Sequence, residues 1–248
     1  KIFKTKVENK KWLANVYHLL GKIYYNLVNN KKALDFSMQA MEIRKELGDS
    51  LGIATSANNL SVIYTAMGDF EKALEYNFTS LGIMRRYNDK DGIANSLFNI
   101  GLVYARTGKL EEALKNYDEA LKIFSDINDP RSKAIVLANK ALALMQLENY
   151  PEAEESLLKS LDIAKRIELI DIMALNYNML SQLYTQREEY KKALEAKDAF
   201  TAIKDTIFNQ ESRNRITELE VKIETENEKR EKEIIQKSMG LEISLNNN

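Results

Sequence analysis

Three asparagines at equal spacing are the residues best suited to a specific chemistry. Asn59, Asn99 and Asn139 occupy equivalent places in successive 40-residue periods. An asparagine amide offers one acceptor and two donors, so it can pair with both the N–H and the C=O of an extended peptide, whatever that peptide's sequence. The alternative is that these amides bond to neighbouring helix groups or to water, and both roles can coexist. We expect Asn99→Ala and Asn139→Ala to preserve folding and weaken partner binding.

The side chains that most enzymes need are scarce. The chain contains no cysteine and a single histidine, His18, which excludes thiolate nucleophiles, disulfides and metal sites built on several histidines. We interpret His18 as an ordinary groove or core residue. Carboxylate pairs such as Glu154 and Glu155 are typical of a solvated helix face. We therefore predict no enzyme activity, no catalytic residue, no metal and no cofactor.

The composition narrows the class of protein further. The 248 residues include 36 basic and 37 acidic side chains, for a formal net charge of −1. This balance provides no broad positive field, so we expect no nucleic-acid partner. No apolar run reaches the roughly 18 residues of a membrane span, so we expect no membrane contact within this segment. Only 9 glycines and 2 prolines favour helices over many short strands.

A 40-residue period organises most of the chain. Two columns of alanine run through five repeats: Ala14, Ala54, Ala94, Ala134 and Ala174, and Ala33, Ala73, Ala113, Ala153 and Ala193. A third column is always small: Gly21, Ser61, Gly101, Ala141 and Ser181. A fourth is always large: Tyr24, Tyr64, Tyr104, Leu144 and Tyr184. A fixed period of this length indicates a solenoid of stacked repeats.

Each repeat reads as a helical hairpin. Leu97, Ile100 and Tyr104 recur at spacings of 3 and 4 and form the apolar stripe of a first helix, and Ala113 and Tyr117 begin the stripe of a second. The small columns allow the paired helices to approach closely, because a larger side chain there would separate them.

Turn and cap residues mark the helix ends. Gly68 and Gly108 suit the left-handed residue after a first helix. Asp49, Asp89 and Asp129 are placed to cap the next first helix, and Pro130 suits its first position.

The pattern within one repeat resembles the tetratricopeptide repeat family, whose residues Trp, Leu-Gly, Tyr, Ala, Phe and Ala correspond here to Leu97, Ile100-Gly101, Tyr104, Ala113, Tyr117 and Ala120. The likeness covers residues 14 to about 207. The period of 40 rather than about 34 resembles the branch found in bacterial peptide-sensing regulators, kinesin light chains and cell-polarity adaptors. It implies an all-α fold, a right-handed α-α superhelix followed by a long charged C-terminal helix.

The resemblance divides the chain into segments. Residues 1–13 look like the remnant of a preceding repeat. Five repeats then follow at 14–53, 54–93, 94–133, 134–173 and 174–209. Residues 210–248 form a separate, charged helical tail. Ile216, Leu219 and Ile223 begin a heptad seam in this tail that soon fades. This pattern predicts that the tail is either a capping helix that continues as an exposed spacer or a coiled-coil linker that forms a homodimer.

The junction at residues 204–226 resembles the end of tetratricopeptide arrays in bacterial membrane-anchored sensor proteins with histidine kinase, cyclase or DNA-binding outputs. This resemblance implies a sensor or scaffold part of a larger signalling protein, in the periplasm. Without the sensor resemblance, the cytoplasm is the expected compartment. The absence of cysteine is compatible with both the periplasm and the cytoplasm.

In the family, the stripe of the first helix opposite the buried one lines a concave groove that holds a peptide or protein ligand. Carried over to this chain, the groove comprises Asn58, Asn59, Asn95, Phe98, Asn99, Leu102, Arg106, Asn139, Leu142, Met145, Asn178 and Gln182. Two functions remain open. The chain is either a non-catalytic module that binds an extended peptide in this groove, or a structural oligomerisation module whose groove is filled by its own tail or by a second copy.

Overall fold

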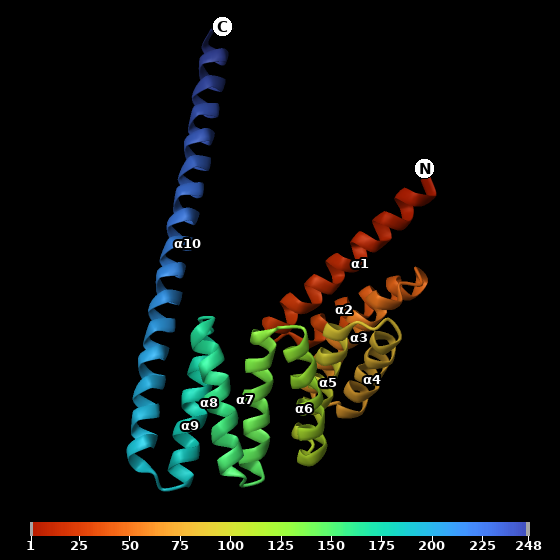
Figure 1. Ribbon diagram of the computed structural model, residues 1–248. Helices are drawn as coiled ribbons and strands as arrows, with labels where there is room; N and C mark the ends of the chain where they lie inside the picture. Colours follow the sequence, from red (N-terminus) through yellow and green to blue (C-terminus); the bar gives the residue numbers. More distant parts are fainter. Residues whose placement is uncertain (1, 247–248) are drawn as a thin grey trace.

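The computed structural model describes residues 2–246, with side chains for 7–210, 212–226 and 229. This part of the chain contains no strand and forms ten helices (Figure 1): α1 (Ile2–Asn26), α2 (Asn30–Glu46), α3 (Ser50–Met67), α4 (Phe70–Arg86), α5 (Lys90–Arg106), α6 (Leu110–Asp126), α7 (Pro130–Gln146), α8 (Tyr150–Arg166), α9 (Ile170–Gln186) and α10 (Tyr190–Asn246). The predicted all-α superhelix is confirmed.

The helices pack as hairpins, α1 with α2 through α9 with α10, and each second helix also packs on the first helix of the next hairpin. The first helices of successive hairpins also contact one another; for example, α3 contacts α5, and α7 contacts α9. They therefore form one continuous row of the array. Figure 1 shows the hairpins side by side, with α1 and α10 at opposite ends.

A left-handed residue follows every helix from α1 to α9, at regular intervals along the chain: Val28, Gly48, Gly68, Asn88, Gly108, Asn128, Glu148, Glu168 and Glu188. The predicted left-handed positions of Gly68 and Gly108 are confirmed. The predicted caps are confirmed as well, because the carboxylates of Asp49, Asp89 and Asp129 accept hydrogen bonds of 3.0, 3.0 and 3.1 Å from backbone N–H groups in the first turn of α3, α5 and α7.

The column of small residues permits the close helix approach that its composition predicts. A methyl group added at Gly101 would lie 2.6 Å from a ring carbon of Tyr117 and 3.3 Å from the carbonyl oxygen of Ala113. Tyr117 itself is only 1% exposed, so its ring fills the space beside the glycine. The contact between α5 and α6 therefore depends on the absence of a side chain at Gly101.

Two predicted boundaries are absent from the structure. Helix α1 runs unbroken from Ile2 to Asn26, so residues 1–13 do not end in the turn that a preceding repeat requires. Helix α10 runs unbroken from Tyr190 to Asn246, so the tail is not a separate element but a continuation of the fifth hairpin's second helix. In each case good helix formers continue across the expected boundary without a glycine or proline to stop them.

Candidate functional site

Two adjoining hollows open along the row of first helices. The larger, of 450 Å³, lies among α1, α3 and α5 and contains Asn58, Asn59, Asn95 and Asn99. The smaller, of 120 Å³, also borders these three helices and contains Asn99, Leu102 and Arg106. Val62 and Asn99 line both. The structure thus brings together six of the twelve predicted groove residues around Asn99.

Four asparagines of the predicted groove make hydrogen bonds inside the chain. Asn59 Nδ2 donates to Ser37 Oγ at 2.8 Å, and Asn58 Oδ1 accepts from Ser96 Oγ at 3.1 Å. Asn139 Nδ2 donates to the carbonyl oxygen of Ile135, one turn earlier, at 2.8 Å. These amides therefore help to join neighbouring helices or brace their own helix.

Asn95 is engaged in the same way, since its Nδ2 donates to the backbone oxygen and to Oδ1 of Asp91 at 2.9 and 3.0 Å. Asn99 differs from these four asparagines. Among the described residues its amide has no hydrogen-bond partner, and it stands half-buried where the two hollows meet. Both of its polar atoms are thus available to a ligand.

The larger hollow has walls of opposite charge. Lys22 comes from α1, whereas Asp89 and Asp91 come from the start of α5. Burial, followed by the nearby positive charges of Arg44 and Lys22, lowers the pKa of His18 to about 4. His18 is therefore neutral at pH 7, and Lys22 supplies the positive charge of this wall.

Burial also raises the pKa of Asp91, with further contributions from the carboxylates of Asp89 and Asp129. Extra negative charge on this wall is therefore unfavourable. A positive group on a ligand would relieve that repulsion.

The remaining predicted groove residues lie outside the two hollows. Phe98 packs its ring against Tyr117, with 6.0 Å between centroids. Met145 is only 8% exposed and belongs to a hydrophobic core cluster, which corrects its assignment to the groove. Neither hollow includes Asn139, Leu142, Asn178 or Gln182.

Some residues of the hollows were absent from the predicted groove. His18 and Lys22 occupy the columns of Asn58 and Val62 one repeat earlier, so the 40-residue period could have identified them. Asp89 and Asp91 could not be found in this way, because they lie at the start of α5 rather than on its groove stripe.

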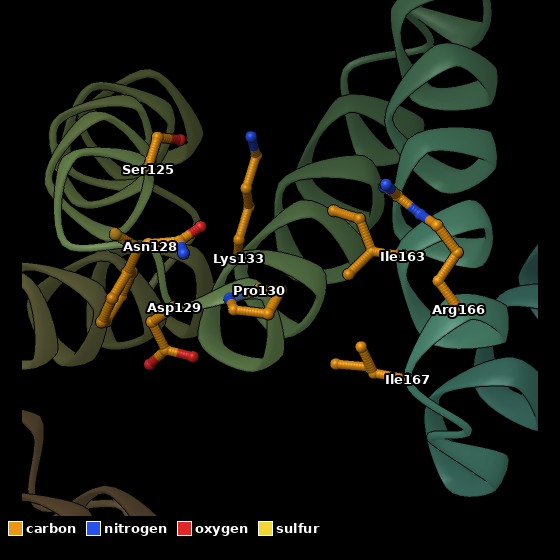
Figure 2. A pocket seen from close by; sticks show the side chains of 9 residues that line it. Ser125, Asn128, Asp129, Pro130, Lys133, Ile163, Arg166 and Ile167 are labelled. Carbon is orange, nitrogen blue, oxygen red and sulfur yellow. The ribbon is translucent and has the colours of Figure 1, made fainter.

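A third hollow, of 350 Å³, lies away from the groove asparagines, between the α6–α7 turn and the end of α8 (Figure 2). Two of its charged groups already serve the fold. Asp129 caps α7, and Arg166 pairs with Asp162 at 2.9 Å. We assign this hollow to the packing of a helix turn.

The described side chains contain no group of three or more histidine or acidic residues able to hold a metal ion. Within the same residues, every helix is too short or too polar to cross a membrane.

Comparison with known proteins identifies the family. The tetratricopeptide repeat pattern matches residues 12–86, 79–126 and 132–199, which together make up more than half of the chain. The chain is a tetratricopeptide repeat protein. Proteins of this family generally mediate contacts between proteins, and their fold is typically a non-catalytic scaffold. No curated protein matches the sequence significantly.

Solved structures of tetratricopeptide repeat proteins share this fold. Nearly identical TPR-like repeats of kinesin light chain type from Podosopora anserina superpose with a TM-score of 0.63 at 17% identity, over 80% of this chain and 97% of theirs. The PilF protein of Pseudomonas aeruginosa gives 0.62 at 22% identity, over 78% of each chain. A Rap protein in complex with competence and sporulation factor gives 0.60 at 16%, over 83% of this chain and 66% of the other.

Proposed function

We propose that this tetratricopeptide repeat protein binds an extended peptide, or an extended segment of a protein, in the two hollows along α1, α3 and α5, and that it catalyses no reaction. The observation that carries the proposal is Asn99. Its amide has no partner among the described residues, yet it stands between the larger, polar hollow and a smaller hollow that Val62 and Leu102 line together with Arg106. A free amide in that place can clamp the backbone of a bound strand.

The surroundings of Asn99 suit such a strand. Val62 and Leu102 provide apolar surface for a side chain, and Arg106 can pair with a carboxylate in the smaller hollow. In the larger hollow, Lys22 favours an acidic group of the peptide, and Asp89 favours a basic one. This polarity would fix the direction in which the peptide lies.

A similar fold is known with a bound factor, since the Rap protein was solved together with competence and sporulation factor. We further propose that this chain is the sensor or scaffold part of a larger bacterial signalling protein. The charged helix that continues from the fifth hairpin supports this role, because a long helix can connect a binding array to another domain.

Binding of peptides selected from a random displayed library tests the proposal. The selected peptides would be titrated calorimetrically into the 248-residue chain and into Asn99→Ala. Loss of one amide that pairs with a peptide backbone costs about 1–2 kcal/mol, so the dissociation constant should rise about 5- to 30-fold.

Asn178→Ala is the matched control, because it removes the same amide from a first helix outside both hollows. It should leave the dissociation constant unchanged. Equal affinities for Asn99→Ala and the unmodified chain would refute the site.

A further inference from the structure

The outer face of α1 is apolar and uncovered. Trp12, Leu19, Ile23 and Leu27 are 67%, 60%, 47% and 67% exposed. Their spacings of 7, 4 and 4 place them along one side of α1, with Val16 between the first two and Leu27 directly after the helix ends at Asn26. We call these five residues the α1 stripe. An apolar stripe of this length on a helix normally packs against another element.

The later hairpins show what kind of element covers this face. The residues that follow Ile23 at 40-residue intervals are Ile63, Val103, Ala143 and Leu183, and none is more than 1% exposed. Each lies on a first helix that packs against the second helix of the preceding hairpin. Val16 and Ile23 of the α1 stripe thus correspond to positions that are buried in every later hairpin, whereas Leu19 and Leu27 correspond to Asn59 and Met67, which stay partly open.

A further repeat stacked in the same manner does not fit here. Trp12 stands in the column of Gly52 and Gly92. A methyl group at Gly92 would already come within 2.4 Å of Met84 Sδ on the preceding helix, so a tryptophan would force that helix away. In addition, α1 continues straight past the region where a turn would return the chain over it (Figure 1). A helix that covers the α1 stripe must therefore sit further out than in the later hairpins.

The charge of α1 indicates the chemistry of that helix. Residues 2–26 contain five lysines and one glutamate, for a formal net charge of +4. Lys11 and Lys22, at a spacing of 11, lie on one flank of the stripe. An acidic helix with a narrow apolar seam would complement this surface.

Such a helix occurs in the same chain. Ile216, Leu219 and Ile223 lie on one face of α10 and are 57%, 52% and 58% exposed. Residues 216–226 contain four glutamates and one lysine, for a formal net charge of −3, and Glu220 and Glu224 flank the seam. The apolar seam of the tail therefore matches the apolar α1 stripe, and the glutamates beside the seam match the lysines beside the stripe.

We propose that the tail of α10, residues 212–226, docks on the α1 stripe of a second copy of this chain. Within one chain the two surfaces lie at opposite ends of the array, and the described parts of α1 and α10 make no contact (Figure 1). Two copies that exchange tails reciprocally form a closed dimer, whereas one-way docking forms chains of molecules. This interface does not include the asparagines of the two hollows, although Lys22 on its flank also lines the larger hollow.

Light scattering of the 248-residue chain and of point variants tests the interface. The unmodified chain, of 28.5 kDa, should show at least twice that mass at micromolar concentration. Ile23→Asp and Leu219→Asp each place a charge in the apolar contact, and each should raise the dissociation constant at least about tenfold. Trp12→Asp, at a more exposed position, provides a second α1 variant in case Ile23→Asp unfolds.

Val221→Asp is the matched control for the tail, because Val221 is 57% exposed but faces away from the seam, and it should not change the mass. A mixture of Ile23→Asp with Leu219→Asp provides the decisive result. It should recover dimers, since one intact tail can still meet one intact stripe.

A single-chain mass for the unmodified protein would overturn the proposal. The proposal would also be overturned if Leu219→Asp abolished the dimer while both α1 variants left it intact. That result would show that two tails hold the dimer together.

Discussion

Two helical glycines offer a stringent test of the packing between paired helices. Gly82 lies within α4 and is exposed, and a methyl group added there would meet no atom within 4 Å. Gly101 lies within α5 and is buried, and the same methyl group would lie 2.6 and 2.7 Å from two ring carbons of Tyr117. Alanine at either position gains about 1 kcal/mol of helix propensity. The two variants therefore differ only in what the methyl group meets.

The steric cost at Gly101 follows from these contacts. The ring of Tyr117 is 1% exposed and has no free space to move into. Overpacking of a filled core costs about 1–3 kcal/mol, so Gly101→Ala should lower the free energy of unfolding by up to about 2 kcal/mol after the gain in propensity. Gly82→Ala should raise it by about 1 kcal/mol.

Urea denaturation followed by circular dichroism in the far ultraviolet measures both changes. The fourth repeat suggests a rescue, because Ala141 and Leu157 occupy the columns of Gly101 and Tyr117 there and share one core cluster. In a Tyr117→Leu background, Gly101→Ala should cost about 1–2 kcal/mol less than in the unmodified chain. If Gly82→Ala and Gly101→Ala changed stability equally, the proposed tight contact between α5 and α6 would be refuted.

Three further predictions concern helix ends and pH. Val28→Gly should stabilise the chain by about 1 kcal/mol in thermal melts, because Val28 is β-branched, 83% exposed and held at a φ of 57°. Lys109→Asp should raise the free energy of unfolding by about 1 kcal/mol, because Lys109 makes no side-chain cap for α6. Asp129→Ala should lower the free energy of unfolding by about 1 kcal/mol, because it removes the cap of α7. Urea denaturation measures both changes. Because burial and nearby positive charges lower the pKa of His18 from 6.5 to about 4, the unfolded chain takes up this proton first. The free energy of unfolding should therefore fall as pH decreases from about 6.5 to about 4, and less steeply in His18→Gln, as thermal melts across this range would show.

The sequence alone predicted the hairpins, their caps and the small column, because these depend on local rules that recur in every repeat. A carboxylate at Asp129 caps the helix that begins at the next residue, whatever surrounds it. The left-handed turns were predicted only at glycines. Glu148 adopts the same conformation because backbone hydrogen bonds, such as Asn149 N–H to Leu144 O at 2.9 Å, close the turn without one.

The ends of the array were predicted less well than its middle. Both α1 and α10 extend beyond the repeat pattern. The sequence contains no glycine or proline that would have shown where the repeat ends and the helix continues. The exposure of Ile23 likewise could not be predicted from the repeat, since the same column is buried in every later hairpin.

For the candidate site, the sequence determined which residue types recur on the groove stripe, while the tertiary structure decided which of them are available. Asn59 and Asn99 are equivalent by period and chemistry. Asn59 meets Ser37 of the preceding hairpin, whereas the equivalent of Ser37 beside Asn99 is Asn77, and no hydrogen bond joins these two described side chains. A partner supplied by a neighbouring hairpin depends on packing across the array, so only the folded structure distinguishes an amide that joins helices from one that is free to bind.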